Sequence, residues 1–309
     1  MTSWYTRNSL LQKNKYVIQE GTFAEKEKPA TVVSAYYEMP SKYTVDDYRK
    51  WISLFLKNIP MYLVFFTEAK TYEFIKECRR GHEERTRIIV LERSEWVANR
   101  YQQSEWDALH AIDPEKAIHN PELYKIWFEK LEFVKRVILE NPYGHDDYLW
   151  VDAGICRKES VKRLITKFPV GERMPLDRML VLQVSPYTRR DKEKRAVNGV
   201  ELFGPIENDR IAAGIIAGRK DTWQHYSNLY YTILQKFRSA GLFWGKEQTL
   251  MNSMVLENRN LFSLLQTRPI FQEFWLYSLF YLGSDSILHE RMRDEKRNKD
   301  AIDFNSTRP

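Results

Sequence analysis

Apolar runs alternate with segments of helical periodicity along the first half of the chain. Three short runs, at residues 31–37, 61–68 and 87–93, predict buried strands because they are continuous and rich in β-branched or aromatic side chains. Apolar residues at helical spacing follow the first run from about Thr44, a suitable N-cap, and follow the second run over residues 69–80. This order of strand and helix predicts a parallel sheet with helices on both faces.

The pattern becomes less regular further along the chain. Residues 94–118 predict a polar helical region, 121–140 a long amphipathic helix, and 148–154 and 179–185 two more strands. The basic segment 188–199 predicts a mobile loop, 213–218 a small-residue turn before an aromatic helix, and 247–265 another helix. The nine apolar residues at 274–282 are too few to span a membrane and predict a buried strand or helix.

Composition narrows the class of protein. A chain of 309 residues with 43% hydrophobic content can bury a large core, and its 48 basic and 42 acidic residues are mixed rather than segregated. A dedicated nucleic-acid-binding protein is therefore disfavoured, although the net charge of +6 suits a polyanionic ligand as well as an ordinary surface. Cys78 and Cys156 are too few for a disulfide scaffold and lack the spacing of a zinc site. With no apolar run typical of a signal peptide, we expect a soluble, cytoplasmic protein.

The sharpest candidate for chemistry is Asp152, which follows the apolar residues 148–151 at the end of a predicted strand. Ligands of open parallel sheets bind beyond the carboxyl ends of the strands, and Ala153 and Gly154 leave room there. A carboxylate in that place can hold Mg²⁺ or Mn²⁺, or accept a hydroxyl group of a ribose or sugar. An aspartate that caps a turn or a helix is the structural alternative.

Two later segments add candidates. Gly214 and Gly218 would let a backbone approach a ligand closely, or they serve close packing within a strand. Glu247 and Gln248 open a predicted helix after Lys246, where a carboxylate could act at a cleft edge or simply favour the helix dipole. No GxGxxG or Walker motif is present, so neither a dinucleotide fold nor a P-loop is indicated.

Four segments in order, TVVSAYY at 31–37, WVDAGICR at 150–157, AGIIAG at 213–218 and KEQTLMN at 246–252, resemble the HtrL/YibB family of glycosyltransferases. The likeness spans about residues 30–283. It implies an α/β fold: a GT-A-like single domain over 30–290, with a mixed, mostly parallel central sheet flanked by helices. A nucleotide-binding half would cover about 30–155 and an acceptor half about 156–290, between an irregular segment at 1–29 and a polar tail at 291–309.

The resemblance also implies an activity. Such an enzyme, a hexosyl- or pentosyltransferase of glycan biosynthesis, moves a sugar from a nucleotide-sugar donor, foremost a UDP-sugar, to a hydroxyl acceptor such as a glycan. GT-A enzymes hold a divalent cation, Mn²⁺ or Mg²⁺, with a DxD motif, but here Gly154 stands in place of the second aspartate. Metal dependence is therefore open, with Asp152 and His289 as the candidate ligands.

The remaining roles follow the same resemblance. Glu247, with Asp152, would be catalytic, as the base in an inverting enzyme or a group that orients the sugar in a retaining one. The donor-binding candidates are Ser34, Ala35, Tyr36, Lys130, Asp152, Ala153, Gly154 and Arg157, and the acceptor candidates are Gly214, Gly218, His225, Lys246 and Gln248. A lone histidine such as His225 or His289 is more often structural. A glycan- or nucleotide-binding module without turnover is the alternative function.

Overall fold

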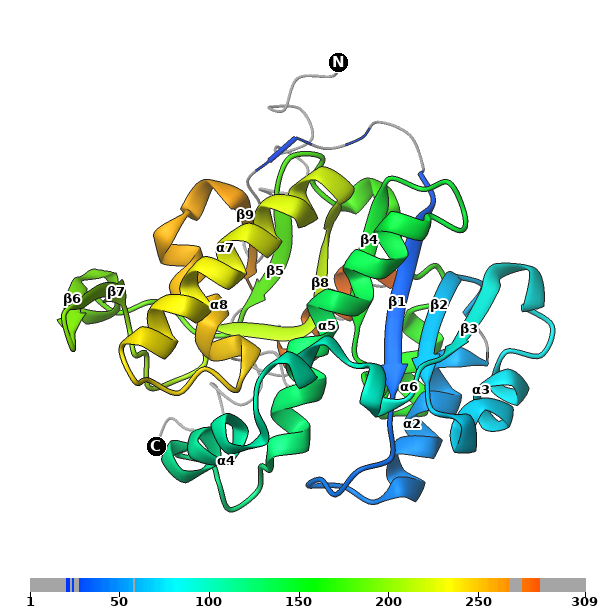
Figure 1. Cartoon of the computed structure of the whole chain (residues 1–309). Helices are drawn as coiled ribbons and strands as arrows, with labels where there is room; N and C mark the ends of the chain where they lie inside the picture. The colour runs from blue at the N-terminus through cyan, green and yellow to red at the C-terminus, as the bar shows by residue number, and fades with distance from the viewer. Residues whose placement is uncertain (1–20, 23, 25–27, 58, 267–273, 284–309) are drawn as a thin grey trace, which may run out of the picture.

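Seven strands form one central sheet in the order β3-β2-β1-β4-β8-β5-β9 (Figure 1). The computed structural model describes residues 21–22, 24, 28–57, 59–266 and 274–283. The strands are β1 (Ala30–Tyr36), β2 (Tyr62–Thr67), β3 (Thr86–Val90), β4 (Asp147–Val151), β5 (Met179–Gln183), β8 (Ile211–Arg219) and β9 (Phe262–Gln266). Only β8 runs antiparallel to its neighbours, β4 and β5, within this sheet. The predicted fold class, a mixed and mostly parallel sheet flanked by helices, is confirmed.

Helices cover both faces of the sheet (Figure 1). One face packs against α5 (Pro121–Glu140), α7 (Lys220–Ser239) and α8 (Glu247–Glu257), with α4 (Gln103–Ile112) packed on α5. The other face packs against α2 (Val45–Leu56), α3 (Tyr72–Cys78), α6 (Glu159–Leu164) and α9 (Tyr277–Gly283). Alternate residues of a strand enter opposite layers, as Val32 and Val33 of β1 do. Strands buried on both faces explain the continuous apolar runs of the sequence.

Capping residues fix where α2 and α5 begin, and α5 also has a capping residue at its end. Thr44 and Asp47 form a capping box at the start of α2, as the prediction of Thr44 as N-cap requires. The side chain of Asn120 accepts a hydrogen bond from the backbone of Leu123 at the start of α5, and Asn141 ends that helix in the left-handed conformation with φ of 40°. The predicted bounds of α5, 121–140, are confirmed.

The prediction of a mobile loop at 188–199 is wrong. A short 3₁₀ turn at Arg190–Lys192 leads into a hairpin of β6 (Lys194–Val197) and β7 (Val200–Phe203). Asn198 and Gly199 connect the two strands with φ of 50° and 80°. Asn-Gly is the preferred pair for such a two-residue turn, so the signal was present in the sequence beneath its many charges.

Two further elements differ from their prediction. The predicted small-residue turn at 213–218 is part of β8, in the middle of the sheet, and the register against β5 shifts between Val181 and Leu182. The helix predicted at 247–265 ends at Glu257, and its last apolar residues form β9 at the sheet edge. Small residues on β8 fit a strand covered on both faces, and burial of the run 262–265 favours a strand there.

Strands from both predicted halves of the domain join in the same sheet. β1 to β4 come from residues 30–155, and β5, β8 and β9 come from the remainder. None of the described helices combines the length and the apolar composition that a membrane span requires. The predictions for residues 291–309, and most of those for 1–29, lie outside the described residues.

Candidate functional site

Asp152 directly follows β4, at the edge where the parallel strands of the sheet end. Its backbone N–H donates to the carbonyl of Gly214 at 2.9 Å, which ties it to the neighbouring strand β8. Its Oδ1 accepts a hydrogen bond from Nε1 of Trp150 at 2.8 Å, and the carboxylate is 42% exposed. A carboxylate fixed in this way keeps a face open to solvent, so it can bind a ligand.

Lys130, from the inward face of α5, lies between two carboxylates. Its Nζ is 2.9 Å from Oδ1 of Asp152 and also donates to Oε1 of Glu247, the first residue of α8. Both Lys130 and Glu247 are buried. Burial opposes the charge on Lys130, but Asp152 and Glu247 outweigh it and raise the pKa of the ammonium group. Lys130 is therefore charged at neutral pH and holds the two carboxylates together.

Glu247 lies behind Lys130 rather than in the open. A small enclosed space beside it is lined by rings that include Trp223, Tyr226 and Tyr230. Burial raises the pKa of Glu247, while Lys130 opposes that shift. Its Oε2 has no hydrogen-bond partner among the described residues. Glu247 thus reaches a ligand only through Lys130.

A cleft of about 200 Å³ opens in front of Asp152. Its walls come from the segment after β1, the start of α2, the first half of α5 and the segment after β4. Five of the eighteen residues that line these walls are aromatic: Tyr36, Tyr37, Tyr48, Trp127 and Trp150. Rings with polar edges around a carboxylate are typical of sites for sugars and nucleobases.

Arg157 provides a cation on the cleft wall. Its guanidinium carbon lies 4.9 Å from the ring centre of Tyr43 and 4.5 Å from that of Trp51, and its Nη1 donates to the hydroxyl of Tyr43 at 3.2 Å. The two rings meet edge to face at 4.8 Å. Stacking on aromatic faces orients a guanidinium while its charge stays available for an anion.

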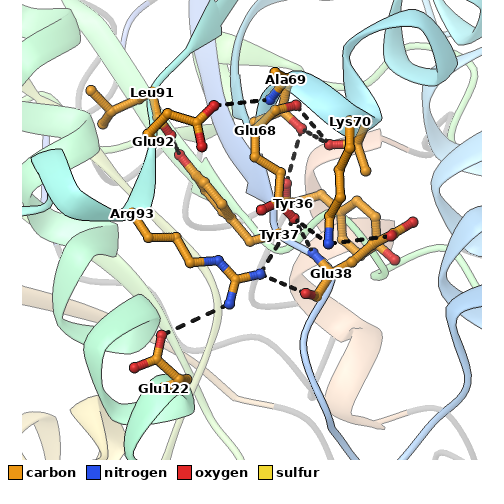
Figure 2. A network of polar contacts seen from close by, with 12 residues as sticks. Tyr36, Tyr37, Glu38, Glu68, Ala69, Lys70, Leu91, Glu92, Arg93 and Glu122 are labelled. Carbon is orange, nitrogen blue, oxygen red and sulfur yellow. Dashed lines mark hydrogen bonds and ion pairs between the residues drawn. The ribbon is translucent and has the colours of Figure 1, made fainter.

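A polar network fixes the segment that leads from β1 into the cleft (Figure 2). Glu68, buried at the end of β2, accepts from the backbone N–H of Glu38 at 2.9 Å. Arg93 donates to the carbonyl of Glu38 at 2.5 Å and to Glu68 at 3.3 Å, and Lys70 lies 3.2 Å from Glu68. These contacts hold the chain before Met39, which lines the cleft, so the network sets one wall of the site.

The structure brings most of the predicted donor residues together. Ala35, Tyr36, Lys130, Asp152, Ala153, Gly154 and Arg157 all line the cleft. Ser34 does not, because it is fully buried within β1 and its hydroxyl donates to the carbonyl of Val151 at 2.7 Å. Gly214 lies beside the site, since a Cβ there would come within 3.6 Å of Oδ2 of Asp152.

Other predicted residues lie elsewhere. Gly218 pairs with Tyr148 at the opposite end of β4, and His225 is exposed on α7. Nζ of Lys246 contacts Glu115 at 2.9 Å and Asp209 at 3.0 Å, and the side-chain amide of Gln248 donates to the carbonyl of Ile211 at 3.1 Å. None of these four lines the described cleft. His289 lies outside the described residues.

Two tryptophans of the site were missed from the sequence. Trp150 lies in β4 two residues before Asp152, which directly follows that strand, so both side chains lie on one side of the sheet, and this alternation was a usable signal. Trp127 precedes Lys130 by one turn of α5. The Lys130–Glu247 contact joins residues 117 positions apart, and no local pattern could have revealed it.

Comparisons with known proteins give distant structural neighbours. No family model matches the chain and no curated protein matches it, so the resemblance to the HtrL/YibB family gains no support. Among solved structures, mouse xyloside xylosyltransferase 1 in its apo form matches with a TM-score of 0.41 and 11% identity, over 83% of this chain and 93% of that one. The PaToxG glycosyltransferase matches with 0.36 and 10%, over 82% and 75%. Both scores are low, and neither comparison bears on the function of this chain.

Proposed function

We propose that this chain transfers a sugar from a nucleotide-diphosphate sugar to a hydroxyl acceptor, in the cleft beside Asp152. The observation that carries the proposal is the solvent-facing Asp152 carboxylate, fixed by Trp150 and Lys130 at the edge where the parallel strands end. Open sheets of this kind bind their ligands at that edge. A UDP-sugar as donor and a glycan as acceptor are the finer form of the same proposal.

The residues of the cleft suit the parts of such a ligand. The rings of Tyr36, Tyr48 and Trp127 offer stacking surfaces for a base or a sugar, and Arg157 offers a charge for phosphate. Asp152 can accept hydrogen bonds from hydroxyl groups of the sugar or the acceptor. The cleft thus supplies contacts for every chemical part of a nucleotide sugar.

Asp152 is also the group that can act on the acceptor. The acceptor oxygen forms a bond to the anomeric carbon while the bond from that carbon to the diphosphate oxygen breaks, and the nucleoside diphosphate leaves with the electron pair. The acceptor's proton needs a base within hydrogen-bond reach, and Asp152 faces the cleft whereas Glu247 does not. We therefore assign the proton-accepting role to Asp152 and a positioning role, through Lys130, to Glu247.

A binding module for glycans or nucleotides is the second candidate. The observation that favours it is the direct ion pair between Lys130 and Asp152, in which Oδ1 of Asp152 is already engaged by the ammonium group. Such a module would share the cleft and the aromatic walls but release no nucleotide from a bound donor.

A panel of nucleotide sugars tests both candidates. Thermal shift measures binding, because a ligand that binds only the native state raises its melting temperature, and nucleotide release measures turnover. The enzyme predicts that at least one nucleotide sugar both raises the melting temperature and yields free nucleotide in the presence of hydroxyl acceptors. Binding with no release would favour the module, and neither binding nor release would refute both.

A further inference from the structure

The side chains at the end of β4 do not fit a divalent metal ion. A GT-A metal site needs carboxylates that face the cleft, and Gly154 stands where the second one would be. Oδ1 of Asp152 already accepts from Trp150 at 2.8 Å and lies 2.9 Å from Nζ of Lys130. No group of three or more histidine, cysteine, aspartate or glutamate residues within the described chain is arranged to hold a metal.

The next carboxylate, Glu247, is turned away from the cleft by the same lysine. Lys130, Trp127 and Trp150 line both the cleft and the small enclosed space beside Glu247, so these three side chains separate the two. Its ammonium group contacts one oxygen of each acid. A cation therefore already lies between the two carboxylates, and it is a lysine of the chain itself.

In this arrangement a further positively charged group is needed to neutralise a bound diphosphate. With all three side chains ionised, Asp152, Lys130 and Glu247 carry one net negative charge, which repels phosphate. Arg157 lines the same cleft, and none of the ion pairs found between described residues includes it. Its guanidinium is oriented by Tyr43 and Trp51, so little side-chain freedom is lost when it binds an anion.

We propose that this site binds the diphosphate of its donor without a divalent metal: Lys130 takes the place of the metal between Asp152 and Glu247, and Arg157 binds the phosphates. The inference rests on the proposed function, since it concerns the same donor. It adds that the site needs no metal cofactor, and it names Arg157 as the residue whose positive charge neutralises the phosphates in place of a metal ion.

Calorimetric titration of the full chain with UDP, GDP and ADP, in EDTA and in excess MnCl₂, tests the inference. We expect at least one nucleotide to bind in EDTA. Its Kd in excess MnCl₂ should differ from its Kd in EDTA by no more than about threefold, because the protein offers no ligand set for the metal. Arg157→Ala weakens that binding by about tenfold or more, the usual effect of losing a charge-assisted hydrogen bond, and Arg157→Lys lies between the two. Arg163→Ala, which removes an exposed arginine of α6, is the matched control and binds as wild type.

The outcomes separate the inference from the function on which it rests. Binding that requires Mn²⁺ overturns the inference and leaves the proposed function standing. Arg157→Ala that binds as tightly as wild type also overturns it, because the phosphates would then be held elsewhere. Failure of all three nucleotides to bind with and without Mn²⁺ counts against the proposed function itself, and the inference falls with it.

Discussion

Replacing Lys130 by methionine tests the ion-pair arrangement at the centre of the site. Methionine keeps the length of the lysine stem but removes its charge and its hydrogen bonds to Asp152 and Glu247. Asp152 is 42% exposed and still accepts from Trp150, so water can compensate for part of its loss. Glu247 is buried and loses its counter-ion, so most of the lost free energy of unfolding comes from leaving the Glu247 carboxylate buried without a positive charge beside it.

The expected magnitude follows from that burial. Removing one partner of a buried ion pair costs about 3–5 kcal/mol, because the other charge stays in a place of low polarity. For a domain of this size that lowers the melting temperature by about 6–20 °C. The pKa of Glu247, already raised by burial, rises further, so the folded variant holds a proton that the unfolded chain releases. The Lys130→Met variant therefore keeps its stability in acid and loses stability as the pH rises from the pKa of Glu247 in the unfolded chain toward its pKa in the folded protein. The difference in free energy of unfolding between variant and wild type widens over that range.

Urea denaturation at about pH 4 and about pH 7 measures both effects. Lys125→Met on the same helix is the control: Lys125 contacts Glu122, which is 37% exposed, and the exposed Gln103, and an ion pair of that kind contributes at most about 1 kcal/mol. Lys130→Met with Glu247→Leu should regain most of the loss, because two apolar groups replace the buried pair. A single variant no less stable than the control, or a double variant no better than the single one, would refute the reasoning.

Three further predictions concern Glu129 of α5, the turn between β6 and β7, and Trp150 beside Asp152. Burial raises the pKa of Glu129 to about 8, so its folded form keeps a proton above the usual pKa; wild-type stability should fall by up to about 1.4 kcal/mol per pH unit between about 4.5 and 8, and Glu129→Gln should flatten this profile in urea denaturation. Gly199→Ala should cost about 1–2 kcal/mol of unfolding free energy from backbone conformation alone, since an added Cβ meets nothing within 4 Å; a cost-free substitution would contradict the observed φ of 80°. Trp150→Phe removes the donor to Asp152 and should lower steady-state turnover about tenfold or more, whereas unchanged turnover would mean that Asp152 needs no such support.

The front half of the fold could be predicted because each element there is specified locally. Continuous apolar runs predicted β1, β2 and β4, and helical periodicity between Pro121 and the Asn141-Pro142 pair predicted the bounds of α5. The rear half depends on packing between distant segments. The run 262–265 has no periodicity to separate helix from strand, and its place beside β5 decides the matter.

The candidate site likewise has one part that local sequence predicts and another that depends on packing between distant segments. Asp152 could be found because the end of an apolar strand is a position with a known role in parallel sheets. Lys130 and Glu247 were candidates as well, but their contacts with each other and with Asp152 could not be predicted, because these contacts arise from α5 and α8 meeting on one face of the sheet. Arg157 was suspected from its place after Asp152, but the rings of Tyr43 and Trp51 that orient it come from a segment more than a hundred residues earlier.

The most direct test of the central claim compares two aspartates at opposite ends of β4. Asp152 follows the strand and faces the cleft, whereas Asp146 precedes it and pairs with Arg219 and Lys220. Nucleotide release from the best donor should fall by about a hundredfold or more in Asp152→Asn, the usual effect of losing a general base, while the Kd for the nucleotide is retained and Asp146→Asn behaves as wild type. Turnover by Asp152→Asn at the wild-type rate would contradict the assignment of sugar transfer to this carboxylate.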